Sequence, residues 1–434
     1  MMTVKKTGVY LGCAGLLLVG CSSKVSLKGK REELIVAEVD SDRIHDKDST
    51  PVEIDSGEER NNEYVQPYFS PSHCYLPLVF SPTPTEQWRS KLDFEATNEI
   101  RMTAGPVVAE EKVFCMDAAG IIYALDQKTG KRLWRMSTTL VGKNGQIGGA
   151  LAYSNGILIV TSSFAEGFGL DATNGKIRWR IKLPAACKGD GLTISNGKAF
   201  ALCGNSSLHC LDINSGKILW SHVGMIPEAS FIGSASVAID NNIVYCIYPS
   251  GEIFSLLEET GSVIWEAMLS KFSLTNAACS FLHPRACPVV KNGVLYTVSA
   301  NAQTSAFDIR SGKRLWKNDF GGVQTPIVSG NSIFVFNSNS EVVCLNKDTG
   351  KKRWGKRFIK NSKDIFDWCS MVLLKDHLLI VSPSGDLIYL SVYDGSIKGT
   401  QKIDGSGSGI SVNPAIANSV LYLLLNNGSV VAYK

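Results

Sequence analysis

The stretch "LDQKTGKRLW", residues 125–134, decides the fold because close copies of it recur along the chain. It combines Asp126, a turn that contains Gly130, and Trp134. Five further copies end in tryptophan, at Trp179, Trp220, Trp265, Trp316 and Trp354. A seventh, "LSVYDGSIKG", keeps the frame but ends at Gly399. Successive end positions are 45, 41, 45, 51, 38 and 45 residues apart. A self-similar period of this length predicts a propeller or a solenoid.

Each repeat holds short apolar runs that end in turn residues. In the first repeat these runs are 106–109, 112–116 and 121–125, and they are rich in Val, Ile, Tyr and Phe. Such runs, bounded by Gly, Asn, Asp or Ser, predict strands joined by hairpin turns. A fourth strand starts near Lys131 and carries the tryptophan. Four antiparallel strands per repeat predict one propeller blade.

The two ends of the repeat region complete the count. The last repeat stops at Lys434, before any motif turn or tryptophan, whereas "EQWRSKLDF" carries Trp88 with no strand before it. The N-terminal strand can therefore supply the missing fourth strand of the last blade, which leaves no free edge between blades. We predict an all-β fold over residues 88–434, an eight-bladed β-propeller of four-stranded antiparallel blades closed by the N-terminal strand.

The motif residues have structural explanations. A tight turn needs positive φ at the glycine position, which glycine adopts at low cost. Asp126 and its equivalents can accept hydrogen bonds from turn amides. A tryptophan at the same place in nearly every blade favours packing against the next blade, although a ring of ligand-stacking aromatics is the alternative. The expected blade-docking residues are Trp88, Trp134, Trp179, Trp220, Trp265, Trp316 and Trp354.

The first residues are typical of an export signal. Lys5 and Lys6 precede an apolar run of 13 residues, Gly8 to Gly20, which is too short to span a bilayer as a helix. The run ends in "LVGC", which resembles the bacterial lipobox and implies lipidation of Cys21. The alternative is a plain secretory signal with an incidental cysteine. We expect a signal peptide at 1–20 and a lipidated, largely disordered tether at 21–87, whose aromatic, proline-rich end lies extended on the body. Ser22 and Ser23, with no aspartate after the cysteine, favour the outer membrane by resemblance to lipoprotein sorting.

Charge and cysteine content narrow the function. The net charge of +4 is too weak to predict a nucleic-acid partner. Residues 22–87 hold 7 basic and 13 acidic side chains, so the body from Trp88 onward has a net charge of +8. No C-x-x-C motif occurs, which leaves thioredoxin-like chemistry and c-type haem unsupported. Two disulfides are open possibilities, and their members are Cys203 with Cys210 and Cys279 with Cys287.

The repeat resembles the pyrroloquinoline-quinone-type eight-bladed propeller, whose motif reads A-x-D-x-x-T-G-K-x-x-W. That family includes quinoprotein dehydrogenases with a central quinone and calcium site. This chain has no adjacent cysteine pair, and its six histidines have no metal-ligand spacing. It also lacks a nucleophile elbow and a phosphate-cradling loop. We therefore predict no enzyme, no catalytic residue, no metal and no cofactor.

The lipobox, the tether and the short ring together resemble the outer-membrane protein assembly factor B family. The resemblance implies a scaffold at the periplasmic face of the outer membrane, a monomeric subunit of a complex. Its implied partners are the β-barrel insertase and other assembly lipoproteins. The family's contact loops correspond to "SFIGSAS" (230–236), with Ile232 in place of an arginine, and "HPRACP" (283–288), which lacks the family's acidic residues. The candidate contact residues are Phe231, Ile232, His283 and Arg285.

Two other functions remain open. One is a quinone-dependent dehydrogenase, and the other is a general envelope propeller that binds proteins without an insertase link. Loops from rigid blades converge on one face, which suits binding in general. Exposed strand edges could also receive extended clients by β-augmentation.

Overall fold

The computed structural model describes residues 48–57, 61–97, 100–137, 149–187, 191–226, 235–269, 286–299, 303–337, 339–358, 370–403, 405 and 409–434. The chain divides into two units, Met1–Ile44 and His45–Lys434, and every described residue belongs to the second. The described residues form 32 strands and no helix, so none of them lies in a helix that could cross a membrane.

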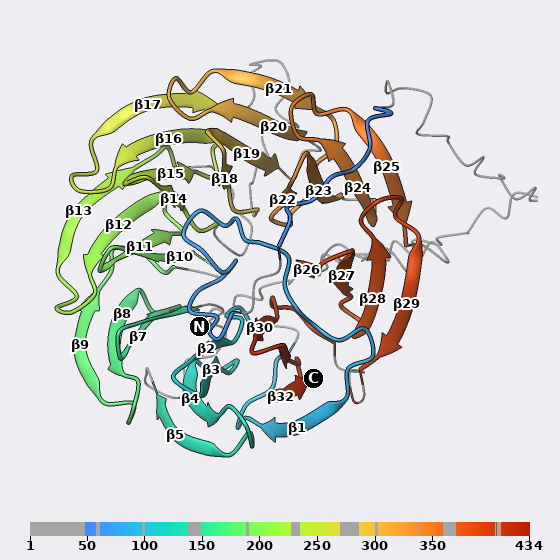
Figure 1. Cartoon of the computed structure of the whole chain (residues 1–434). Helices are drawn as coiled ribbons and strands as arrows, with labels where there is room; N and C mark the ends of the chain where they lie inside the picture. Colours follow the sequence, from blue (N-terminus) through green and yellow to red (C-terminus); the bar gives the residue numbers. More distant parts are fainter. Residues whose placement is uncertain are drawn as a thin grey trace, which may run out of the picture. The chain divides into compact units, whose positions relative to one another are not determined.

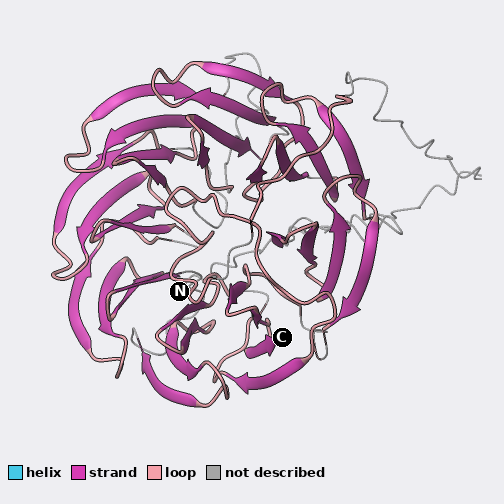
Figure 2. Ribbon diagram, viewed as in Figure 1, coloured by secondary structure: helices cyan, strands magenta, loops and turns pink. Residues whose placement is uncertain are grey.

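The strands form eight four-stranded antiparallel sheets arranged as a ring (Figures 1 and 2). Blade 1 contains β2 (Val107–Ala109), β3 (Lys112–Met116), β4 (Ile121–Asp126) and β5 (Arg132–Ser137); blade 2 contains β6 (Gly149–Ser154), β7 (Ile157–Ser162), β8 (Glu166–Asp171) and β9 (Ile177–Lys182). Blade 3 contains β10 (Leu192–Ser195), β11 (Lys198–Cys203), β12 (Ser207–Asp212) and β13 (Ile218–Val223); blade 4 contains β14 (Ala238–Asp240), β15 (Ile243–Ile247), β16 (Glu252–Leu257) and β17 (Val263–Met268). Blade 5 contains β18 (Val289–Lys291), β19 (Val294–Ser299), β20 (Gln303–Asp308) and β21 (Arg314–Asn318); blade 6 contains β22 (Ile327–Ser329), β23 (Ser332–Asn337), β24 (Glu341–Asn346) and β25 (Lys352–Arg357). Blade 7 contains β26 (Ser370–Leu373), β27 (His377–Val381), β28 (Asp386–Ser391) and β29 (Ile397–Lys402); blade 8 contains β30 (Ala415–Ala417), β31 (Val420–Leu424), β32 (Ser429–Tyr433) and β1 (Glu86–Lys91).

The N-terminal strand closes the ring, which confirms the predicted fold. Strand β1 pairs antiparallel with β32, the last strand of the chain, so Arg89 lies opposite Val431. The backbone pairing continues beyond the strands, where Thr85 and Lys434 exchange two hydrogen bonds of 2.8 and 2.9 Å. Backbone hydrogen bonds between β1 and β32 therefore join the two ends of the repeat region in one sheet.

The core lies between the blades. Residues of neighbouring blades share apolar clusters, such as Phe114 and Ala124 of blade 1 with Leu158 and Phe168 of blade 2. The middle strands are consequently buried on both faces, and β7 has no exposed residue. This explains why their sequences are short continuous apolar runs rather than alternating ones. The fourth strand of each sheet is outermost, and the first strands line the centre (Figure 1).

Each motif tryptophan lies against the turn of the next blade. Its indole Nε1 donates to a backbone carbonyl of that turn at 2.7–3.1 Å, and the pairs are Trp88–Gln127, Trp134–Ala172, Trp179–Ile213, Trp220–Glu258, Trp265–Ile309, Trp316–Lys347 and Trp354–Val392. The indole ring lies over the glycine of that same turn. At Gly312, for example, φ is +67° and a Cβ atom would lie 2.6 Å from Trp265 Cε3. The glycine therefore satisfies both the turn and the close approach of the indole.

Blade 7 has Gly399 in place of the tryptophan. The fourth strand of the neighbouring blade 8 is β1, from the N-terminal side of the repeats, so no motif turn joins it to β32. Two side chains of blade 7 instead bind the chain that enters β1. Tyr389 OH donates to Ser81 O at 3.1 Å, and Gln401 Nε2 donates to Pro84 O at 2.8 Å.

The possible disulfide between Cys203 and Cys210 is wrong. Cys203 is bonded to Cys187, and Cys210 is a free buried thiol. In the β11–β12 hairpin Cys203 lies opposite Ser207, whereas Cys210 lies opposite Phe200, so the two cysteines are three strand positions apart, about 10 Å. Cys187 comes from the segment that connects blades 2 and 3. The other possibility cannot be placed, since Cys279 lies outside the described residues.

Candidate functional site

The centre of the ring is occupied by the chain itself. We call residues 61–78 the strap. It leads from blade 8 around the centre to blade 7 (Figure 1) and bonds to the first strands, which are the inner edges of the sheets. The sequence predicts a largely disordered tether here. Its aromatic, proline-rich end was expected to lie extended on the body, and in the structure residues 48–57 and 61–85 contact the blades.

The strap meets the same position of one blade after another. This position is the second residue before the first hairpin turn of each blade. Its backbone contacts join Tyr64 to Val108, Val65 to Tyr153, Pro71 to Ile239 and Ser72 to Val290, at 2.7–3.0 Å, and Leu78 N donates to Leu373 O at 2.9 Å. Side chains continue the series, from Gln66 to Ile194 N, Asn61 to Ile416 O and Cys74 to Val328 O. The strap thus satisfies backbone groups that an inner edge strand would leave unpaired.

Strap side chains are buried among those of the blades. Tyr64 and Leu78 join apolar clusters shared by neighbouring blades, with exposed fractions of 4% and 1%. His73 is also buried. Its Nδ1–H donates to Pro288 O at 2.7 Å, and its Nε2 lies 3.2 Å from Ser236 Oγ. Burial lowers the pKa of His73 to about 4, so the imidazole is neutral at pH 7.

Residues 48–50 lie at the start of β25 in blade 6, and residues 53–55 contact the β22–β23 turn and Lys291 of blade 5. Asp48 N donates to Lys352 O of β25 at 2.9 Å, and Thr50 Oγ1 accepts from Arg353 Nη2 at 2.8 Å. Asp55 pairs with Lys291 and accepts from Ser329 Oγ at 2.9 Å. Burial alone would raise the pKa of Asp55, but the hydrogen bond and charge of Lys291 hold it below the usual value. This acidic segment therefore contacts basic side chains at two places, Arg353 of β25 and Lys291 of β18.

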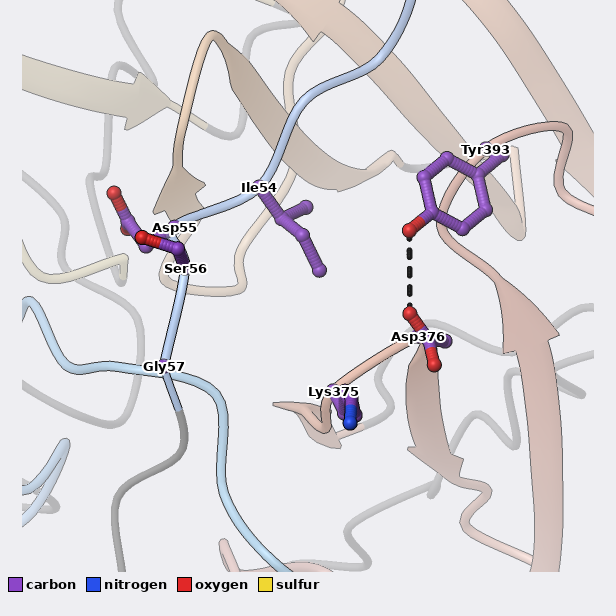
Figure 3. A pocket seen from close by; sticks show the side chains of 7 residues that line it. All are labelled: Ile54, Asp55, Ser56, Gly57, Lys375, Asp376 and Tyr393. Atoms are coloured by element: carbon purple, nitrogen blue, oxygen red, sulfur yellow. Dashed lines mark hydrogen bonds between the residues drawn. The ribbon is translucent and has the colours of Figure 1, made fainter.

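An open hollow lies where this segment meets blade 7 (Figure 3). Its lining residues are Ile54, Asp55, Ser56, Gly57, Lys375, Asp376 and Tyr393. Tyr393 OH donates to Asp376 Oδ1 at 3.2 Å, and hydrogen bonding to this carboxylate contributes after burial to raising the pKa of the phenol.

The residues predicted to contact a partner lie outside the described residues. Cys21, Phe231, Ile232, His283 and Arg285 are all in this group. In the sequence, residues 227–234 come between β13 and β14, and residues 270–285 come between β17 and β18. Both are connections from a fourth strand to the first strand of the next blade, so one leads into blade 4 and the other leads out of it. The described residues contain no cluster of three potential metal ligands.

The family model of the outer membrane protein assembly factor BamB matches residues 80–147 and 118–356. The chain belongs to the BamB family. A BamB of Yersinia pestis is 24% identical over 360 residues, which cover 81% of this chain and 89% of that protein. The matched region begins after the strap, so the strap lies outside what the family model describes.

Solved structures share the fold. BamB from Moraxella catarrhalis has a TM-score of 0.68 at 19% identity and covers 81% of this chain and 100% of its own. A europium-containing methanol dehydrogenase has a TM-score of 0.66 at 15% identity, with 84% of this chain and 89% of that chain covered. The ring architecture is thus common to BamB proteins and to dehydrogenases. The BamB assignment rests on the family model.

Proposed function

We propose that this chain is a non-enzymatic lipoprotein at the periplasmic face of the outer membrane, where it helps to assemble β-barrel proteins by binding the barrel insertase. The observation that carries the proposal is the BamB family match over residues 80–356. The relatives are outer membrane protein assembly factors by name. The anchor is the acylated Cys21, and the partner surface includes the two neighbouring loops that carry Ile232 and Arg285.

The geometry of the ring supports a scaffold. The motif tryptophans bind each blade to the next, and β1 closes the ring. The loops between blades therefore start from rigid strands, which lowers the entropic cost of binding. The described residues at the centre do not fit a quinone cofactor. Strap residues such as Tyr64, Gln66 and His73 are buried there and bonded to the blades, in the place that a central cofactor would need.

Three measurements test this proposal. The insertase should co-purify with the full chain in mild detergent, and Ile232→Asp with Arg285→Glu should reduce its recovery, whereas Leu133→Lys on the outer strand of blade 1 should not. Cys21→Ala should release the protein from the outer-membrane fraction. Addition of pyrroloquinoline quinone and calcium should give no dye reduction with alcohols. Absence of the insertase from the purified complex, or quinone-dependent dye reduction, would overturn the proposal.

A further inference from the structure

The outer strands of the blades differ in one respect that bears on binding. Each is an edge strand with backbone groups directed away from its sheet, and proteins protect such edges from other strands with charged side chains. Seven of the eight outer strands, all within the described residues, expose at least one charged side chain. These are Arg89 and Lys91 of β1, Arg132 and Arg135 of β5, Arg178, Arg180 and Lys182 of β9, Glu266 of β17, Lys317 of β21, Arg357 of β25, and Lys398 and Lys402 of β29.

Strand β13 of blade 3 is the exception. Its sequence, "ILWSHV", has no Lys, Arg, Asp or Glu, and burial lowers the pKa of its histidine. Leu219 and Val223 expose 45% and 60% of their surface. The apolar edge continues past the strand, where Met225 and Ile226 expose 47% and 72%. An uncharged, exposed apolar edge of this length is a template for strand addition.

The edge is held rigid from its inner side. Trp220 Nε1 donates to Glu258 O at 3.0 Å, and His222 Nδ1 lies 2.7 Å from Tyr248 OH. Met225 N donates to Glu252 Oε2 at 2.6 Å. Each of these contacts fastens the strand to blade 4, so a partner strand would meet an ordered edge, which lowers the entropic cost of binding.

Blade 6 indicates which kind of occupant an outer edge accepts. There Asp48 N donates to Lys352 O, and Thr50 Oγ1 accepts from Arg353 Nη2, at the start of the outer strand β25. Burial alone would raise the pKa of Asp48, but hydrogen bonds from Thr50 and the charge of Arg353 hold it below its usual value, so this acidic residue matches the basic start of β25. By the same charge matching, the neutral β13 fits a neutral segment.

We propose that β13 is a docking edge for an extended segment of another polypeptide, with apolar side chains at alternate positions and no charge over about six residues. The segment adds to blade 3 as a fifth strand. Its backbone pairs with β13, and its side chains cover Leu219 and Val223. This inference does not depend on the insertase being the partner.

The test uses the full chain and a labelled peptide of alternating valine and threonine with a solubilising tag, measured by fluorescence anisotropy. Leu219→Lys and Val223→Lys should each weaken binding at least about tenfold, as expected when a charge protects an edge. The matched control is Leu133→Lys, because Leu133 occupies the same position of blade 1 and exposes 48% of its surface. It should leave the affinity unchanged. Circular dichroism melting curves establish that all variants fold.

Several outcomes would overturn the inference. These are absence of peptide binding, equal weakening by Leu133→Lys, or equal binding of a peptide in which lysine replaces valine. A wild-type dimer that Leu219→Lys converts to a monomer would assign the edge to a second copy of the chain instead. Peptide binding without insertase binding would retain this inference and refute the proposed function.

Discussion

Replacement of Gly312 by alanine tests how the blades are locked together. Gly312 has φ of +67°, and an added Cβ atom would lie 2.6 Å from Cε3 and 2.8 Å from Cδ2 of Trp265. The indole is 9% exposed and donates to Ile309 O at 2.7 Å, so it cannot move freely. Gly293, in the same blade, is the matched control, because its φ is +79° and a Cβ atom added there would have no heavy atom within 4 Å.

The expected cost has two parts. Both substitutions place alanine at positive φ, which costs about 1–2 kcal/mol in each variant. Gly312→Ala also forces the indole to shift, and overpacking of this kind costs about 1–3 kcal/mol. The free energy of unfolding should therefore fall by about 2–5 kcal/mol for Gly312→Ala and by about 1–2 kcal/mol for Gly293→Ala.

Urea unfolding followed by circular dichroism measures both values, and a double-mutant cycle identifies the cause. In a Trp265→Ala background the indole is gone, so Gly312→Ala should cost no more than Gly293→Ala does. Equal costs of the two glycine substitutions in the wild-type background would refute the explanation. So would an unchanged cost of Gly312→Ala after removal of the indole.

Three further predictions concern a motif tryptophan, the strap and the disulfide. Trp179→Phe leaves Ile213 O without its indole donor, so the free energy of unfolding should fall by about 1–3 kcal/mol in urea titrations. The pKa of His73 is depressed to about 4, so the folded state resists protonation and stability should fall as the pH drops from about 6.5 to 4, by about 3 kcal/mol. His73→Asn should remove that part of the pH dependence, and an unchanged slope would contradict the role of the imidazole. Cys187→Ser with Cys203→Ser opens a loop of 16-residue separation and should cost about 3 kcal/mol, measured as a lower melting temperature that dithiothreitol no longer changes.

The propeller could be predicted because its information is local and repeated. Each turn glycine meets the tryptophan of the preceding copy of the motif, so a single copy predicts the packing of all of them. The isolated Trp88 and the truncated last repeat predicted the closure by β1 for the same reason. The predicted partner of Cys203 was wrong because closeness in sequence does not make two cysteines opposite each other in a hairpin. There Cys210 lies three positions away, while Cys187 arrives from another blade connection.

The strap was predicted only in part. Acidic residues dominate the average over 22–87, yet "YVQPYFSPSHCYLPL", residues 64–78, has four aromatic residues and no Lys, Arg, Asp or Glu. The aromatic, proline-rich run was expected to lie extended on the body, but the strands that it contacts were not predicted. Its partners are also far away in the chain, since Tyr64 pairs with Val108 and Leu78 with Leu374. No pattern within the strap specifies those partners.

Blade number, blade order and ring closure were thus encoded in short-range patterns of turn glycines, apolar runs and tryptophans. The occupied centre and the accessible edges arise only when the blades assemble. Assembly brings eight first strands together with unpaired backbone groups, which the strap then satisfies, and it leaves the fourth strands outermost. The neutral composition of β13 is visible in the residues alone. Its exposure beside seven charged edges is a property of the ring, because burial depends on which elements become neighbours.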